Sequence, residues 1–205
     1  MHAYDFTTLP LPRFAHTSMF LAGVAVLQAL AATSGKSGRM RSSNAIGAAV
    51  CIIAAAHYAT MHGKDLDEIW GLRYSDWYPT TALLLIEFFW LMTPDNVALR
   101  SGELIACVAL CVLMIFFGQL SRRGGPMCFG TGCLCGAAAL ALVFTGTNSH
   151  GKRANSWAWA FLAIWTLYPV STLLPAKLEQ AALTGLDIVT KGIFGVVVAL
   201  LTLPH

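Results

Sequence analysis

Residues 185–195 read "GLDIVTKGIFG", and the apolar run "VVVALLTL" (196–203) follows directly. Asp187 and Lys191 are the only charged residues of this stretch, and they lie four positions apart, about one helical turn. If the segment crosses a membrane, each charge in hydrocarbon costs about 3 kcal/mol, and such residues normally face a bundle interior, find a partner and serve a function. We therefore expect Asp187 and Lys191 to face the inside of a helical bundle.

The composition indicates an integral, multi-pass membrane protein. Of 205 residues, 57% are hydrophobic and 11% are charged, whereas a soluble domain has about 25% charged residues. The mean hydropathy is +0.65. Glycines, prolines and charges divide the chain into seven apolar runs, each close to the roughly 20 residues of a spanning helix. These runs are 14–33, 44–62, 71–92, 101–121, 126–145, 155–174 and 180–203. We expect an all-α bundle of seven transmembrane helices, formed by residues 1–205 as a single domain in a lipid membrane.

The charge distribution excludes one class of partner and orients the chain. A net charge of +3 is too small to suggest a nucleic-acid partner. Seven spans place the two termini on opposite sides, and the loops richer in Lys and Arg are usually cytoplasmic. Six basic loop residues against five favour an outside N-terminus and a cytoplasmic C-terminus. The six are Lys36, Arg39, Arg41, Arg100, Lys152 and Arg153, and the five are Arg13, Lys64, Arg122, Arg123 and Lys177.

The six cysteines predict no metal site. The densest group, "CFGTGCLCG" (128–136), has no neighbouring histidine and no CxxC pair. Free cysteine is among the most buried residue types and packs as a small apolar side chain. We therefore expect the cysteines to pack between helices.

The third span, "RYSDWYPTTALLLIEF" (73–88), concentrates the remaining intramembrane charge. Arg73, Asp76, Thr80 and Glu87 are spaced by three, four and seven residues, which places them on nearly one side of a helix. Asp76 and Glu87 are then about 16 Å apart along the axis, roughly half the hydrocarbon thickness. Glu87 has no basic neighbour in its span, so we expect burial to keep it protonated, as a proton donor must be.

These charges have both a functional and a purely structural interpretation. Arg73 and Lys191 balance Asp76 and Asp187, so a dry bundle could hold the four as a neutral group. The structural alternative is two intrahelical ion pairs, one in each span. Such pairs stabilise little and are replaceable by apolar residues, so the functional interpretation is favoured. His57, inside the second span, also needs a buried partner, which Asp76 could provide.

Three motifs resemble the corresponding helices of microbial rhodopsins, the seven-helix retinal proteins. They are "RYSDW" (73–77) followed by Thr80, "WTLYP" (165–169) and "LDIVTK" (186–191), in the right order and in the right spans. Together with "HYATMHG" (57–63), they are most similar to proteorhodopsins and related proton pumps of marine bacteria and giant viruses. The resemblance implies a light-driven outward proton pump, not an enzyme, and often a homo-oligomer, trimer or pentamer.

The resemblance also implies a role for each charged residue. Lys191 would bind all-trans retinal covalently as a protonated Schiff base. Asp76 would be its primary counterion and proton acceptor, and Asp187 the second counterion. Glu87 would return a proton from the cytoplasmic side, which completes the third-helix set of Asp76, Thr80 and Glu87 that is typical of pumps.

The remaining roles concern positioning and the pocket. By the same resemblance, His57 would hydrogen-bond Asp76, and Arg73 would lie on the extracellular side of the counterions. The retinal pocket would contain Tyr74, Trp77, Thr81, Leu84, Met114, Gly118, Trp165, Tyr168 and Pro169. Glu179, near the start of the seventh span, could belong to a proton-release group, but an exposed loop glutamate is the favoured interpretation.

Three other functions stay open at this point. A light-gated cation channel would use the same fold, but residues 44–60 contain no carboxylate to line a conduit. A photosensor would need neither Glu87 nor the full acceptor and donor set. A retinal-free transporter or structural membrane protein belongs to another class, and the absence of visible colour after addition of retinal would identify it.

Overall fold

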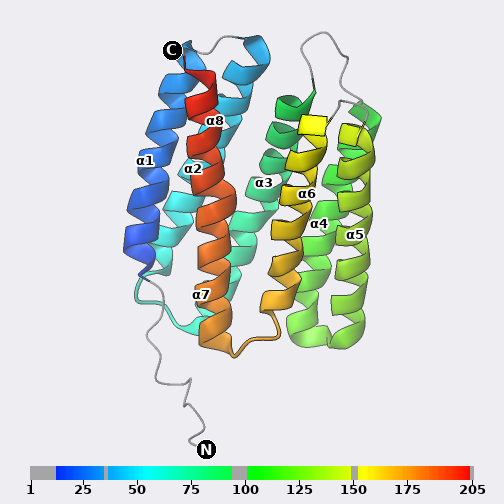
Figure 1. Cartoon of the computed structure of the whole chain (residues 1–205). Coiled ribbons are helices and arrows are strands. Elements are labelled where there is room, and N and C mark those ends of the chain that lie inside the picture. Colours follow the sequence, from blue (N-terminus) through cyan, green and yellow to red (C-terminus); the bar gives the residue numbers. More distant parts are fainter. Residues whose placement is uncertain (1–12, 35–36, 94–100, 149–151, 204–205) are drawn as a thin grey trace, which may run out of the picture.

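The protein is a bundle of helices that run side by side (Figure 1). The structure is a computed structural model that describes residues 13–34, 37–93, 101–148 and 152–203. Residues 1–12 lie outside the described residues. So do Lys36 and Arg100, two of the basic loop residues that were used to orient the chain in the membrane. The described elements are α1 (Phe14–Ser34), α2 (Gly38–Met61), α3 (Leu66–Met92), α4 (Ser101–Gly124), α5 (Pro126–Asn148), α6 (Lys152–Ser171), α7 (Ala176–Asp187), the π-helix η2 (Ile188–Ile193) and α8 (Phe194–Thr202).

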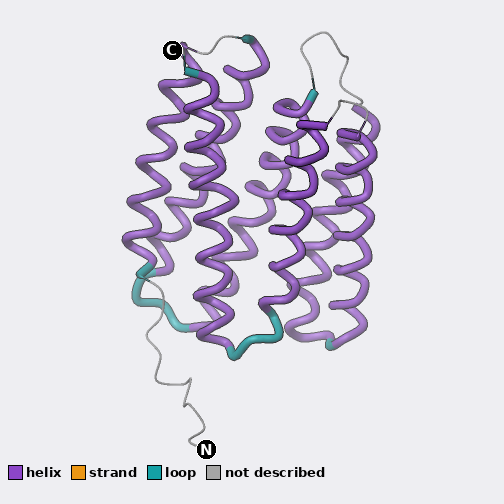
Figure 2. The backbone as a smooth tube through the Cα atoms, viewed as in Figure 1, coloured by secondary structure: helices purple, strands orange, loops and turns teal. Residues whose placement is uncertain are grey.

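These elements make seven rods, because α7, η2 and α8 follow one another without a break (Figures 1 and 2). Each rod packs against its neighbours in the sequence, and the seventh closes the bundle against α1 and α2. The described residues contain no strand. The expected all-α bundle of seven transmembrane helices is therefore confirmed.

Local sequence signals explain where several rods begin. The Ser37 side chain accepts a hydrogen bond from the Met40 backbone and starts α2. Asp65 and Glu68 form a capping box, so α3 begins at Leu66, before the apolar run at 71. Gly125 has a positive φ of 76°, which lets one residue turn the chain from α4 into α5.

The bundle has the polarity expected of a protein in lipid. Large apolar side chains point outward, with Met127 85% and Leu173 81% exposed, whereas Arg73 and Asp76 are fully buried. Among the described residues, five rods are long and apolar enough to cross a membrane: Phe14–Ser34, Gly38–Met61, Ser101–Gly124, Pro126–Thr145 and Ala176–Thr202. Of the other two, α3 carries the buried charges, and α6 contributes the apolar stretch Trp159–Ser171 within the part of it that the structure describes with side chains. The interior is therefore where polar chemistry is concentrated.

Candidate functional site

Lys191 lies in the π-helical segment η2, at the centre of the seventh rod. A π-helix has hydrogen bonds from residue i to i+5, and such segments occur frequently at functional sites. The wider turn alters the direction of the side chains that follow it and the pairing of its carbonyl groups. Only 3% of Lys191 is exposed, so its amine lies inside the bundle.

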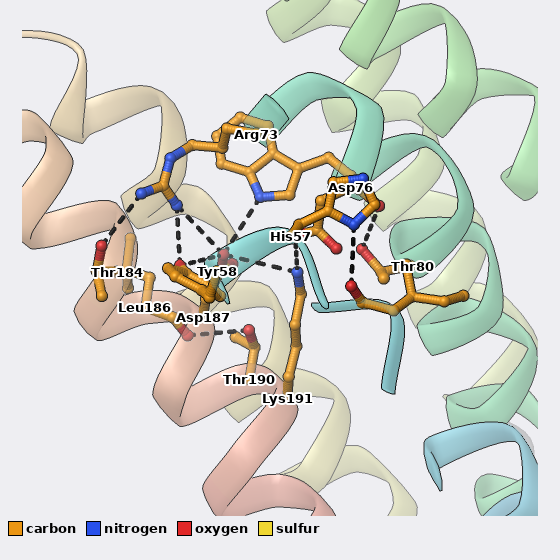
Figure 3. A network of polar contacts seen from close by, with 12 residues as sticks. His57, Tyr58, Arg73, Asp76, Thr80, Thr184, Leu186, Asp187, Thr190 and Lys191 are labelled. Carbon is orange, nitrogen blue, oxygen red and sulfur yellow. Dashed lines mark hydrogen bonds and ion pairs between the residues drawn. The ribbon is translucent and has the colours of Figure 1, made fainter. Parts of the chain in front are cut away.

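The Lys191 amine is placed between two aspartates from different rods (Figure 3). Nζ is 2.6 Å from Oδ2 of Asp76 in α3 and 3.6 Å from Oδ2 of Asp187 in its own rod. The shorter contact is the one between rods. Arg73 likewise pairs with Asp187, at 3.3 Å, rather than with a residue of its own helix. The charges therefore form a group that joins α3 to the seventh rod, and not two intrahelical pairs.

The Arg73 guanidinium is held on three further sides by neutral groups. Its Nε donates to Gln180 Oε1 at 3.0 Å, and its Nη2 donates to Thr184 Oγ1 at 3.1 Å. Its Nη1 donates to the Tyr58 hydroxyl at 3.0 Å as well as to Asp187. Every nitrogen of this buried cation therefore has an acceptor, which offsets much of the cost of burying it.

Asp187 accepts more hydrogen bonds than Asp76. The hydroxyl groups of Tyr58 and Tyr168 each donate to it at 2.8 Å, and Trp77 Nε1 donates at 3.5 Å. Asp76 Oδ1 has no hydrogen-bond partner among the described residues. Donors to a carboxylate favour its charged form, so Asp187 is much the better stabilised of the two anions.

The residues that sequence reasoning missed here are Tyr58, Gln180 and Thr184. Tyr58 is fully buried, and a buried tyrosine hydroxyl usually has a hydrogen-bond partner. Its place directly after His57, inside an apolar span, was the sequence feature that could have indicated a role in the polar site. Gln180 and Thr184 lie four residues apart in α7, and Thr184 lies one position before the motif "GLD". Their spacing of one turn places them on the face that carries Asp187.

Thr80 and His57 make local contacts. Thr80 Oγ1 donates to the backbone oxygen of Asp76 at 2.8 Å. His57 Nδ1 lies 2.9 Å from the backbone oxygen of Ile53, one turn earlier in α2. His57 and Asp76 are both described, and no hydrogen bond joins them, contrary to the expected contact. The histidine ring bonds the nearer backbone carbonyl, that of Ile53, instead.

Glu87 is 1% exposed and lies on the same buried side of α3 as Arg73, Asp76 and Thr80, as their spacing predicts. Its Oε1 is 3.5 Å from Nε2 of Gln28 in α1. No salt bridge to Glu87 occurs among the described residues. A carboxyl buried without a cation is held in its neutral form.

The expectation of an exposed Glu179 is wrong. Glu179 is 3% exposed, and its Oε1 lies 2.6 Å from Nη2 of Arg122 at the end of α4. The Arg122 guanidinium also stacks over the Trp70 ring, 3.4 Å from its centroid. The ion pair and the cation–π contact draw Glu179 into the bundle, against α3 and α4.

Two of the expected pocket residues, Trp77 and Tyr168, contact Asp187 of this charged group. The rings of Tyr74 and Trp77 meet edge to face at 5.5 Å, and Trp77 meets Tyr168 in the same way at 5.8 Å. A Cβ atom at Gly118 would be 3.7 Å from the Tyr74 ring. Trp165 and Leu84 are buried, whereas Thr81, Met114 and Pro169 are half-buried in α3, α4 and α6. The contacts join Tyr74, Trp77, Gly118 and Tyr168 into one wall.

The residues present fit a covalently bound retinal. Lys191 has a primary amine, the group that condenses with an aldehyde. The carboxylates of Asp76 and Asp187 lie next to this amine and would balance a cation at its nitrogen. Asp76 Oδ1 and Trp165 Nε1 are buried without a hydrogen-bond partner in the described part of the chain. Amine, counterions and aromatic walls thus lie together.

The family follows from comparison with known proteins. A family model described as bacteriorhodopsin-like protein matches residues 13–204. The chain belongs to the bacteriorhodopsin-like family. This bacteriorhodopsin-like chain is 29% identical to archaerhodopsin-3 of Halorubrum sodomense over an alignment of 160 positions, which covers 67% of this chain and 60% of that protein. The match therefore spans less than two thirds of the length of archaerhodopsin-3.

Solved structures share the same fold. The viral rhodopsin OLPVRII has a TM-score of 0.79 at 19% identity, with 92% of this chain and 94% of that chain covered. The light-driven proton pump rhodopsin of Coccomyxa subellipsoidea has a TM-score of 0.74 at 22% identity, with 93% and 98% covered. At such identities the likeness establishes the fold alone. This bacteriorhodopsin-like protein is thus a microbial type 1 rhodopsin, a family that implies retinal bound to a lysine.

Proposed function

We propose that this rhodopsin is a light-driven outward proton pump with all-trans retinal on Lys191. The observation that carries the proposal is the 2.6 Å contact between Lys191 Nζ and Asp76, on a helix that also buries Glu87 eleven residues further on. One carboxyl touches the nitrogen, and a second lies about 16 Å along the axis from the first. The rhodopsin of Coccomyxa subellipsoidea, which shares this fold, is described as a light-driven proton pump, and this is consistent with the proposal.

The two aspartates would have different roles, Asp187 as a lasting negative charge and Asp76 as the proton acceptor. Bound retinal would supply the absorption of light and, by its change of shape, a change in the proton affinity of the Lys191 nitrogen. Asp187 keeps its charge because Tyr58, Tyr168 and Arg73 all donate to it. Asp76 has one oxygen without a partner among the described residues. Asp76 is therefore the base that takes the proton from Nζ.

Glu87 would make the transfer directional. It lies on the far side of Lys191 from Arg73 along α3, since Arg73 precedes Asp76 by three residues and Glu87 follows it by eleven. A proton that leaves toward Arg73 and is replaced from Glu87 has crossed the membrane in one direction. With the N-terminus outside, as the loop charges favour, this direction is outward.

Illumination of sealed vesicles tests the proposal directly. Full-length protein, expressed with all-trans retinal, would be reconstituted in lipid vesicles with a pH electrode in the bath. We expect a light-dependent pH change that a protonophore abolishes. Under voltage clamp, the photocurrent should keep its sign when the ion gradients are reversed. A current that reverses with the gradient would establish the channel alternative instead.

A Glu87→Gln variant should slow the return of the proton to Lys191. A positioned proton donor typically contributes at least about 100-fold to a rate, so recovery of the visible absorbance after a flash should slow by about that factor. Azide, a small diffusible acid, should restore part of the rate. The matched control is Glu68→Gln, at an exposed position of the same helix. Unchanged recovery in Glu87→Gln would show that Glu87 is not the donor.

A further inference from the structure

One buried amide in α1 contacts the carboxyl of Glu87. Gln28 is fully buried, although the rest of the buried face of α1 is mainly apolar. Its Nε2 lies 3.5 Å from Glu87 Oε1, and its Oε1 lies 3.5 Å from the thiol of Cys51 in α2. Burying an amide in a bundle is unfavourable unless its polar atoms are paired. Both polar atoms of this amide have a partner.

Two glycines make room for this amide. A Cβ atom at Gly195 in α8 would lie 2.9 Å from both the amide carbon and the Oε1 of Gln28. A Cβ atom at Gly47 in α2 would collide with Nε2 of Gln28 and lie 2.6 Å from Oε1 of Glu87. Any larger residue at either position would displace the amide. The fold thus provides a specific niche, at the junction of α1, α2 and α8, that holds Gln28 against Glu87.

The same contacts reach the π-helix. The Cys51 sulfur lies 3.5 Å from the backbone oxygen of Lys191 as well as from Gln28. Side-chain contacts therefore run from Glu87 through Gln28 and Cys51 to the backbone of the residue that carries the reactive amine. The two residues that connect Glu87 to Lys191 by this path, Gln28 and Cys51, belong to α1 and α2. The proton acceptor Asp76, in contrast, contacts Lys191 directly from α3.

We propose that Gln28 is a positioning residue for Glu87, with its amide fixing the carboxyl of Glu87 and coupling it, through Cys51, to the Lys191 segment. The amide N–H bonds Oε1, so the proton of a neutral Glu87 resides on Oε2. A change in the π-helix reaches the same amide through the Cys51 thiol. This inference rests on the proposed role of Glu87 as donor.

Infrared difference spectra of the full-length protein with bound retinal test the proposal. The band to follow is the carbonyl stretch of protonated Glu87, identified as the band that Glu87→Gln removes. In Gln28→Leu, loss of the N–H bond should move this band to higher wavenumber. Recovery after a flash should slow about tenfold, the effect expected from one lost hydrogen bond. A purely packing role for Gln28 would leave the band in place.

Two further variants make the outcome decisive. Gln119→Leu is the matched control, because Gln119 is exposed and bonds Tyr78, away from Glu87, and it should change neither band nor rate. Cys51→Ala removes the thiol and keeps the amide, so it should broaden the band and slow recovery by a smaller factor, about threefold. It also provides a readout if Gln28→Leu does not fold.

The possible failures are distinguishable. If Glu87→Gln removes a carbonyl band and slows recovery, but Gln28→Leu and Cys51→Ala move neither, the positioning role is overturned and the pump proposal stands. If Glu87→Gln itself has no effect on band or rate, the donor assignment fails, and the role of Gln28 fails with it.

Discussion

A Lys191→Ala variant should show no visible absorption band when it is expressed with all-trans retinal. The Lys191 amine is buried between two aspartates, beside the aromatic wall of Tyr74, Trp77 and Tyr168. Removing the amine removes the atom to which retinal would be joined, and alanine offers no substitute. We therefore expect complete loss of colour, measured on purified protein against the unchanged chain.

Loss of colour must be separated from loss of folding. Lys191→Ala leaves Asp76 without its ion-pair partner, and breaking a buried pair typically costs about 3–5 kcal/mol. A Lys191→Ala, Asp76→Asn double variant removes both charges and should recover helical content, still without colour. Lys64→Ala changes an exposed lysine that pairs with Glu68, and it should keep the full band. A visible band that persists in Lys191→Ala would contradict retinal attachment at this residue.

The fold could be predicted from the sequence because it depends on patterns within each segment. The apolar runs gave seven rods, and the spacing of Arg73, Asp76, Thr80 and Glu87 put all four on the buried side of α3. The start of α3 was harder, since its first turn is polar and is decided by the capping box at Asp65, not by apolar periodicity.

The contacts between rods could not be predicted in the same way. Arg73 bonds Gln180 and Thr184, over one hundred positions away, because α3 and α7 pack at a particular rotation. The ion pair from Arg122 to Glu179 has the same origin, and the sequence alone suggested an exposed Glu179. The π-helix could not be predicted from residue spacing either, because its hydrogen-bond pattern changes within one continuous helical rod.

An Asp76→Asn variant should bind retinal but no longer pump. Asparagine keeps the shape of the side chain but cannot take up a proton from Lys191 Nζ, which lies 2.6 Å away. The light-dependent pH change in vesicles should fall by at least about 100-fold, the typical contribution of a positioned base. The visible band should remain and move to longer wavelength, because a negative charge beside the Lys191 nitrogen stabilises the ground state more than the excited state.

Asp187 differs from Asp76 in that it forms an ion pair with Arg73. It also accepts hydrogen bonds from Tyr58 and Tyr168. Asp187→Asn leaves the buried guanidinium without its anion, so it should lower the free energy of unfolding by about 3–5 kcal/mol. Asp76 makes no ion pair with Arg73, and in Asp76→Asn the Lys191 amine keeps Asp187, 3.6 Å away, as a partner. We therefore expect Asp76→Asn to lose less stability than Asp187→Asn and to fold. Asp67→Asn, at an exposed position in the first turn of α3, is the control for the amide substitution. If Asp76→Asn pumps at the unaltered rate, the proton acceptor is another group, and the division of work between the two aspartates is wrong.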